Sequence, residues 1–478
     1  MEQIVQQIVV NFAKKMIANY LEKGLYDIGA MAEDILEMSK EVSMDILSTF
    51  IADTDAALVA LKEERRDDGI TVHERSVPRS LYTALGDFTY ERTYFKTKDG
   101  MSYILDGLLG VDAYERVDAH VSARLANEAG HASFGKSAGA VTGGALSRQT
   151  AWRKAMESGE VAALPPRVAS TPERIHIFAD EDHAHLQDGH GTFLPLVTVC
   201  SGKRQVSEGR NELVDRTHLS GYGLKPETFW EYAYAVCEAQ YEMSKVKEVF
   251  IYGDGAPWIE ASDVCFPDAV RVLDAYHYMK KMKALTAGDV CGKFASSLRA
   301  AVARGDKDGF DATCVRMADA IGKSMAPGKE RDKKLRSISG AANYLLARWD
   351  AVMNMAREGS IGSCTEAMVS HVFSERFSRS PMGWSKPGIQ KMAQIRVYQE
   401  NGGSVLPSDI GAAKVSNNGR RKVSPFVMKY DRLVKQQQKE IFTGTKDWRI
   451  FEHEHIELAA PSGTRVALEA LARMRDIA

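Results

Sequence analysis

The chain has 478 residues and a mass of 52.8 kDa, with 62 Lys and Arg residues against 64 Asp and Glu residues. The formal net charge of -2 excludes a uniformly basic chromatin-type protein and a protein dominated by an acidic tail. A local basic patch is still enough for nucleic-acid binding. Hydrophobic content of 44% with 26% charged residues is typical of a globular chain of several domains.

The N-terminal segment and the cysteines predict a reduced cytoplasmic protein. Glu2 precedes the first apolar stretch and Lys14 and Lys15 follow it, which is the reverse of a secretory signal. No apolar run reaches the roughly 18 residues of a membrane span. The six cysteines are scattered and form no Cys-x-x-Cys pair, so neither disulfides nor a cysteine zinc site is expected.

Apolar residues at helical spacing predict that residues 1–70 form helices within an N-terminal region over residues 1–74. Residues 1–70 contain seven basic and fourteen acidic residues, a net charge of -7. This charge makes the region a poor surface for phosphate. We expect an amphipathic helical pair that packs on the rest of the chain or on a second subunit.

Residues 75–165 are predicted to combine a small β element with helices. β-branched and aromatic side chains recur in an alternating pattern over residues 81–95, and the segment Lys98–Gly100 supplies a turn. Helices are expected at Val117–Ala129 and Leu146–Ser158, separated by a Gly/Ser-rich interruption at Gly135–Gly144, with Ser147 as an N-cap. Two helices around a short break suit a helix-turn-helix DNA-binding region. An ordinary helical connector is the alternative.

Pro165-Pro166 marks the start of an α/β domain that we assign to residues 166–405. Five strands and one helix are expected in an order that gives a mixed sheet. The predicted strands are Arg174–Asp180, Phe193–Cys200, Glu212–Leu219, Glu248–Tyr252 and Ala269–Leu273, with a helix at Thr228–Ser244. A large helical insertion follows at about 276–360.

The C-terminal part of the chain is basic. Residues 371–450 hold fifteen basic and six acidic residues, a net charge of +9, interleaved with aromatic side chains. That combination suits a nucleic-acid groove, although a solvated charged face has the same composition. We treat residues 406–478 as a separate basic C-terminal region.

Carboxylates follow two of the predicted strands. Asp180 ends the first strand with Asp182 two residues further on, and Asp254 follows the fourth strand between Gly253 and Gly255. Acids at the carboxyl ends of neighbouring strands point into the crevice where α/β sheets bind ligands. Hard cations such as Mg²⁺ prefer these oxygen ligands, and the glycines allow a polyanionic backbone to approach. Turn formation or helix capping is the alternative role of such acids.

A third acid, Glu366, lies in the first turn of a helix predicted to begin near Gly362. Val369, Val372 and Phe373 would form the buried stripe of this helix. The helix could bring Glu366 against the sheet and complete an acid triad. Favourable charge at a helix N-terminus is the alternative role of Glu366.

Several ordered motifs carry a resemblance to a known family. They are Arg92-x-Tyr-Phe, Ala179-Asp-Glu-Asp-His183 with Gln187, Gly253-Asp-Gly-Ala256 with Trp258-Ile259, Leu273-Asp-Ala-Tyr-His277 with Lys280, and Ser374-Glu-Arg-x-Ser-x-x-Pro-Met-Gly-Trp-Ser385. Over residues 75–405 the chain resembles the ISLre-type insertion-sequence transposases, a group that includes transposase-like UPF proteins of bacterial genomes and is related to the Mutator-like transposases.

The resemblance implies an RNase H-like catalytic domain and a DDE triad that cuts and joins double-stranded DNA at the ends of a mobile element. By position the triad is Asp180, Asp254 and Glu366, with Asp182 as an alternate for the first acid. These acids would hold two Mg²⁺ (or Mn²⁺) ions. His277 belongs to a motif resembling the D/C-x-x-H feature of Mutator-like enzymes. It could act at the scissile phosphate or be structural.

The same reading assigns DNA contacts and partners. The candidate DNA-binding residues are Arg148, Arg153, Lys280, Arg376, Arg379, Trp384 and Lys386. A homo-oligomer is expected because two DNA ends must be joined. We expect the protein to act at the nucleoid in the cytoplasm, and we expect no membrane partner. Trp258 and Trp384 could stack on a base, although packed tryptophans are the more common outcome.

Two other functions fit the same residues. One is an RNase H-like metal-dependent nuclease that uses Asp180 with Asp182. Such exonucleases favour Asp-x-Glu in the first strand and lack the helical insertion, whereas this chain has Asp-Glu-Asp. The other is a DNA-binding relative that has lost catalysis, against which the three intact acids argue.

Overall fold

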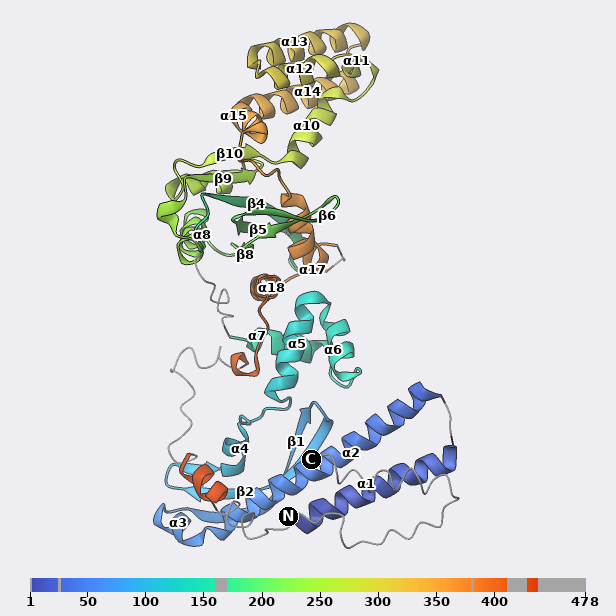
Figure 1. Ribbon diagram of the computed structural model, residues 1–478, viewed down its shortest axis with the longest axis vertical. Coiled ribbons are helices and arrows are strands. Elements are labelled where there is room, and N and C mark those ends of the chain that lie inside the picture. The colour runs from blue at the N-terminus through green and yellow to red at the C-terminus, as the bar shows by residue number, and fades with distance from the viewer. Residues whose placement is uncertain (1, 25–26, 160–169, 380–381, 411–427, 437–478) are drawn as a thin grey trace. The chain divides into compact units, whose positions relative to one another are not determined.

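The structure is a computed structural model that describes residues 2–24, 27–159, 170–379, 382–410 and 428–436 (Figure 1). The chain divides into two compact units. Unit 1 comprises Met1–Val121 with Asn417–Ala478, and unit 2 comprises Ser122–Ser416. Part of the predicted basic C-terminal region, residues 411–427 and 437–478, lies outside the described residues.

Unit 1 combines long helices with a small antiparallel sheet, so the helical and β predictions for residues 1–110 are confirmed. Its elements are α1 (Glu2–Lys23), α2 (Ile28–Ala60), α3 (Lys62–Asp67), β1 (Thr71–Thr83), β2 (Gly86–Thr97), β3 (Gly100–Ser102) and α4 (Ile104–Leu109). The strands pair in the order β1-β2-β3, and the predicted turn joins β2 to β3.

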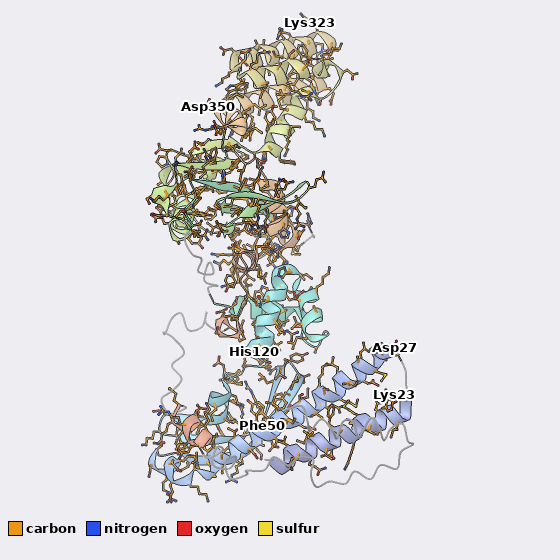
Figure 2. The ribbon with its side chains drawn as sticks, in the orientation of Figure 1. Lys23, Asp27, Phe50, His120, Lys323 and Asp350 are labelled. Carbon is orange, nitrogen blue, oxygen red and sulfur yellow. The ribbon has the colours of Figure 1, made fainter. Side chains whose placement is uncertain are left out.

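The core of unit 1 lies between α2 and the sheet. Leu58 of α2 and Phe95 of β2 are fully buried, and Tyr430 from the C-terminal segment joins them. The Asp27 side chain accepts the backbone N–H of Ala30 and so caps α2 at its N-terminus. Figure 2 labels Lys23 and Asp27 at the adjoining ends of α1 and α2.

Three helices open unit 2, and they correct one expectation. They are α5 (Ala119–His131), α6 (Phe134–Thr142) and α7 (Arg148–Glu157). The segment expected to interrupt the helices is mostly the helix α6. Ser133 caps its N-terminus and Gly143, at φ 60°, ends it, so these signals outweigh the low helix propensity of Gly135 and Gly139. The predicted Ser147 cap is confirmed, because its side chain accepts the N–H of Thr150.

The central sheet has five strands in the order β10-β9-β4-β5-β8. Seven strands occur in this part of the chain: β4 (Arg174–His185), β5 (Gly191–Cys200), β6 (Gly202–Ser207), β7 (Arg210–Val214), β8 (Thr217–Ser220), β9 (Glu248–Gly253) and β10 (Val270–Leu273). β4 is parallel to β9, which is parallel to β10, whereas β5 is antiparallel to both β4 and β8. The mixed α/β class is therefore confirmed.

One strand prediction was wrong in its details. The segment expected to form a single strand at 212–219 is divided between β7 and β8, because the chain turns at Asp215, whose φ is 51°. β7 pairs with the unpredicted β6 in a separate two-stranded hairpin, and only β8 enters the main sheet. The polar, exposed sequence of β6 concealed it, because a strand without a buried face has no apolar alternation.

The two faces of the sheet are buried by different helices. Ile175, Ile177 and Ala179 of β4 pack with α8 (Pro226–Gln240) on one face. The opposite face, which includes Phe178 and Tyr252, packs with the segment α16 (Thr365–Val369), η4 (Ser370–Ser374) and α17 (Glu375–Phe377), and with α18 (Lys386–Glu400). Alternate residues of β4 therefore face different helices, as strand geometry requires.

The predicted insertion is a helical bundle with its own core. Its helices are α10 (Ala275–Thr286), α11 (Asp289–Gly292), α12 (Ala295–Arg304), α13 (Lys307–Ser324), α14 (Lys329–Ala347) and α15 (Trp349–Met353), followed by η3 (Asn354–Ala356). The remaining short elements of unit 2 are η1 (Met243–Lys245), α9 (Pro257–Glu260), η2 (Ala261–Val264) and η5 (Pro407–Asp409). Figure 1 shows the bundle beyond the β10 side of the sheet, and Figure 2 labels Lys323 and Asp350 in it. Among the described helices, none has the length and apolar character needed to cross a bilayer.

Candidate active site

Asp180, within β4, and Asp254, just past the end of β9, lie where the parallel pairing of these two strands ends. The first strand was predicted to end at Asp180, but β4 continues to His185 because its pairing with β5 extends that far. Phe178 pairs with Tyr252 in parallel register, and Asp180 and Asp254 each follow two residues later. The two backbones approach closely, since a Cβ on Gly253 would lie 3.0 Å from the carbonyl oxygen of Ala179. Gly253 is therefore required here for its small size.

Asp180 belongs to the face of β4 that packs against the helix segment bearing Glu366. Burial raises the pKa of its carboxyl group to about 7, and the negative charges of Glu181 and Asp274 act in the same direction. The backbone N–H of Glu181 and the nearby imidazole of His277 oppose this rise. A carboxyl group with such a perturbed pKa beside a nearby charged group is typical of a functional site.

Asp182 has a packing role in this structure. It is buried, and its Oδ1 accepts hydrogen bonds from the hydroxyl groups of Ser374 and Ser378, both at 3.0 Å. Its second oxygen is buried without a hydrogen-bond partner. Burial raises the pKa of Asp182, and the two serines oppose that rise. Asp182 thus joins β4 to η4 and the residue after α17, whereas Asp180 lies near His277.

Asp274 and His277 form a pair beside these acids. Asp274 caps α10, its Oδ2 lies 3.2 Å from His277 Nδ1, and the hydroxyl groups of Ser363 and Thr365 donate to its Oδ1. Burial alone would raise the pKa of Asp274, but these hydrogen bonds outweigh it and hold the pKa at about 2. The pKa of His277 is raised, first by its hydrogen bond to Asp274 and further by the charges of Asp180 and Asp254.

The loop that carries Asp254 is held by the helical insertion. The hydroxyl group of Tyr344 on α14 donates to the carbonyl oxygen of Asp254 at 2.6 Å. Arg348, just after α14, donates to the carbonyl oxygen of Gly255 at 2.8 Å and packs over the Tyr344 ring. Gly255 has a φ of 76°, and a Cβ there would lie 2.2 Å from Arg348 Nε. The insertion therefore fixes the position of the second acid.

Glu366 lies in the first turn of α16, as predicted, with an exposed side chain. The preceding residue, Thr365, is buried and bonded to Asp274, and Val369 and Val372 are buried on the sheet as expected. In the described part of the chain, however, no three His, Cys, Asp or Glu side chains are arranged to hold a metal ion. The structure thus brings Asp180, Asp254 and His277 together and attaches the Glu366 helix beside them, but does not close a three-ligand centre.

The predicted DNA-binding residues separate into exposed and buried groups. Those with exposed side chains are Arg148, Arg153, Lys280, Arg379 and Lys386. Trp384 is 4% exposed and donates its indole N–H to the carbonyl oxygen of Phe377. Trp258 is also packed in the core, at 8% exposure. In this structure neither tryptophan offers a ring face for stacking.

Arg376 is 3% exposed, which does not fit its expected contact with phosphate. Its Nε donates to the carbonyl oxygen of Ala129 at 2.7 Å, and its guanidinium packs over the rings of Phe134 and Trp384. Burial lowers its pKa to about 10. Arg376 therefore joins α17 to the three-helix segment, a role that its sequence context among basic residues did not indicate.

Sequence reasoning missed Tyr344 and Arg348 and gave Asp274 no role beyond its motif. The first two lie about 90 residues after Asp254, so only the tertiary structure brings them to its loop. The signal for Asp274 was available. An Asp at the end of a strand, three residues before a His, satisfies both helix capping and a side-chain contact at i, i+3.

Comparisons with known proteins place the chain in a family. The model of the uncharacterised protein family UPF0236 matches residues 21–412. UPF0236 protein TTE0402 of Caldanaerobacter subterraneus subsp. tengcongensis is 32% identical over 430 residues, covering 88% of this chain and 84% of the relative. A second relative from that organism, whose name joins eleven designations from TTE0033 to TTE2212, is 30% identical over 453 residues and covers 93% of this chain and 92% of the relative. The chain therefore belongs to the UPF0236 family.

Proposed function

We propose that the protein is a DDE transposase that cleaves and joins DNA at the ends of an insertion sequence. The observation that carries this proposal is the meeting of Asp180 and Asp254 where the parallel pairing of β4 and β9 ends, with His277 beside them. The three groups come from separate predicted motifs, spread over about 100 residues of sequence. Their convergence on one edge is what a polynucleotidyl transferase site requires.

The sheet supports an RNase H-like fold for the catalytic domain. Its first strand, β4, is central, with the antiparallel strands β5 and β8 on one side and the parallel strands β9 and β10 on the other. The resemblance to insertion-sequence transposases implies this arrangement, with the first acid on the central strand and the second on the adjacent parallel strand. The helical insertion between β10 and Glu366 also lies where that resemblance expects it.

The donor set fits divalent cations. Asp180 and Asp254 offer carboxylate oxygens, and the raised pKa of Asp180 reflects the cost of burying negative charge that a bound cation would offset. Two Mg²⁺ or Mn²⁺ ions would stabilise the attacking and leaving oxygens of phosphodiester cleavage and strand transfer. Glu366 is the third donor, and the proposal requires α16 to bring it closer when DNA binds, as catalytic contacts often tighten with substrate.

His277 would act on a phosphate oxygen in this site. Asp274 holds its Nδ1 side, which leaves Nε2 as the atom able to meet a ligand. The raised pKa of His277 favours the protonated imidazole, whose charge complements phosphate. Asp274 is therefore a positioning residue for His277.

The segment α6–α7 supports binding to duplex DNA. One face of α7 exposes Arg148, Gln149, Trp152 and Arg153, while Ala151, Lys154 and Ala155 on the other face are buried. A second helix that opens with exposed basic and amide side chains can enter a major groove, where Arg and Gln contact base edges. The helix-turn-helix was expected from helices at Val117–Ala129 and Leu146–Ser158, and in the structure α6 stands before α7 in place of the expected interruption.

The names of the relatives also fit a mobile element. One relative's name joins eleven locus designations in one organism, and another joins four. One protein recorded under many locus designations is what an element that inserts copies of itself would produce. This observation favours a transposase over a nuclease that serves the cell.

The nuclease alternative is weakened by the position of Asp182, because both its serine contacts hold it in a packing role. The catalytically silent DNA-binding relative keeps one observation in its favour. The described residues present no three-ligand group for a metal ion. Cleavage assays separate these functions.

The test uses the full chain, Mg²⁺ and a duplex that carries the sequences flanking its gene. Asp254→Asn removes one proposed ligand, and Asp268→Asn, an exposed acid between β9 and β10, is the matched control. We expect cleavage at defined borders by the parent and by Asp268→Asn, and none by Asp254→Asn. Binding without cleavage in all three proteins would favour the silent relative, and non-specific degradation would favour the nuclease.

A further inference from the structure

A pocket opens on the helical insertion, and most of its lining comes from α10, the helix that carries His277. It has a volume of about 660 Å³ and lies against α10 and α12. Its lining includes Tyr276, Tyr278, Met279, Lys280, Lys283 and Arg299. This volume falls within the roughly 300–1,000 Å³ of small-ligand sites in proteins.

The lining combines positive charge with exposed apolar surface. Lys280, Lys283 and Arg299 all have exposed side chains, and no acidic residue lines the pocket. Tyr276 is 46% exposed and Met279 is 63% exposed, so neither side chain serves to fill a core. A ligand that suits this surface carries negative charge together with a flat or apolar body.

Tyr276 connects the pocket to the candidate active site. Its ring meets the His277 ring edge-on, with centroids 5.4 Å apart. The Nζ of Lys280 lies 5.5 Å from the Tyr276 ring centroid. Arg299, the lining residue from α12, lies close enough to Tyr278 to lower the pKa of Tyr278 against the larger effect of burial. The pocket and the candidate active site are therefore joined by the contact between Tyr276 and His277.

We propose that this pocket binds an unpaired nucleotide of the DNA strand held in the active site. The base stacks on the exposed ring of Tyr276, and Lys280, Lys283 and Arg299 contact the neighbouring phosphates. A base within a duplex hides its faces in the stack, so the nucleotide must be single-stranded or extruded. This inference rests on the proposed function, because only that function brings a DNA strand end to this site.

The pocket also explains the position of Tyr276 in the sequence. The capped start of α10 fixes His277 through Asp274, and Tyr276, the residue before His277, keeps its ring 46% exposed. An aromatic ring beside the reacting phosphate would hold the adjoining nucleotide in register. The same helix therefore orients the imidazole and binds the base.

Binding in EDTA tests the pocket without any need for cleavage. The probes are a labelled oligothymidylate of about ten nucleotides, within the usual site size of single-strand binders, and a blunt duplex of the same length. Tyr276→Ala should weaken oligothymidylate binding about 5-fold to 160-fold, because stacking of one base contributes about 1–3 kcal/mol. Tyr276→Phe should retain it, because the ring remains. Duplex binding should be unchanged in both variants.

Two charge-reversal variants, one inside the pocket and one outside it, supply the matched control. Lys283→Glu should weaken oligothymidylate binding, whereas Lys293→Glu, an exposed lysine that does not line the pocket, should have a smaller effect. Thermal unfolding of each variant checks that its fold is intact. Equal oligothymidylate binding by the parent and Tyr276→Ala would overturn the inference, and so would parallel losses for both probes.

The outcome is separable from that of the proposed function. If the parent cleaves its flanking DNA but Tyr276→Ala binds oligothymidylate as tightly as the parent, the nucleotide pocket is rejected and the transposase is not. Tyr276-dependent binding by a protein that never cleaves its flanking DNA would reject the transposase and leave the nucleotide pocket standing.

Discussion

His176 lies in β4, four residues before Asp180, and couples the stability of the sheet to pH. It is 2% exposed, stacks on Phe250 and lies 3.1 Å from the hydroxyl group of Tyr252. Burial lowers its pKa to about 4, and the positive charges of Arg174 and Lys203 act in the same direction. The folded sheet therefore keeps this imidazole neutral.

The sign and size of the effect follow from linkage. A histidine with a pKa near 6.5 when unfolded and about 4 when folded contributes its full stability above pH 6.5, and this is lost as the pH falls toward 4. The complete shift corresponds to about 3 kcal/mol in the free energy of unfolding. Between pH 7.5 and pH 5 the expected loss is about 2 kcal/mol.

Urea unfolding of the parent and of His176→Gln at these two pH values measures this effect. Tryptophan fluorescence reports mainly on unit 2, which holds five of the six tryptophans: Trp152, Trp230, Trp258, Trp349 and Trp384. His176→Gln should lower stability at pH 7.5 but lose about 2 kcal/mol less than the parent on going to pH 5. His190→Gln, in the exposed turn after β4, is the composition-matched control. Equal losses in the parent and His176→Gln would refute the reasoning.

Three further predictions concern the site and its supports. Asp274→Asn should lower the pKa of His277, because it removes the largest cause of its rise; an NMR titration that finds no change would contradict this. Gly255→Ala should lower the free energy of unfolding by about 1–3 kcal/mol, because its backbone is left-handed and its methyl group would meet Arg348; a loss within error in urea unfolding would argue against that contact. Arg153→Ala should weaken duplex binding and reduce the slope of log K against log salt by about 1, if this exposed arginine neutralises one phosphate; an unchanged slope would remove α7 from the DNA surface.

The elements with strong periodicity were predictable from the sequence. The apolar runs of β4, β5 and β9 and the capped start of α7 produced local signals that the tertiary structure did not override. The helix α6 was missed because its glycines suggested a break, although Ser133 and Gly143 supplied good start and stop signals. The strand β6 of the β6–β7 hairpin was missed because it has no buried face.

The candidate site was predictable only where local sequence determines it. The parallel direction of β4 and β9 brings Asp180 and Asp254 side by side, although β4 runs past Asp180 to His185 instead of ending there as predicted. The support from Tyr344 depends on how the insertion packs, which no local pattern encodes. Likewise, Arg376 belongs to a basic stretch of sequence but faces the core, because its helix turns that residue toward α5.

The most direct test of the central claim is whether Asp180, Asp254 and Glu366 act as one catalytic unit. The measurement is the single-turnover rate of end cleavage in Mg²⁺ for Asp180→Asn, Asp254→Asn, Glu366→Gln and the triple variant. Each single change should lower the rate by more than about 100-fold, because even outer-shell partners of a metal cost about 10–100-fold. The triple variant should be no slower than the slowest single variant, since groups that act together are not additive. A Glu366→Gln protein that cleaves within about 3-fold of the parent rate, far below the losses that ligand removal causes, would contradict the account.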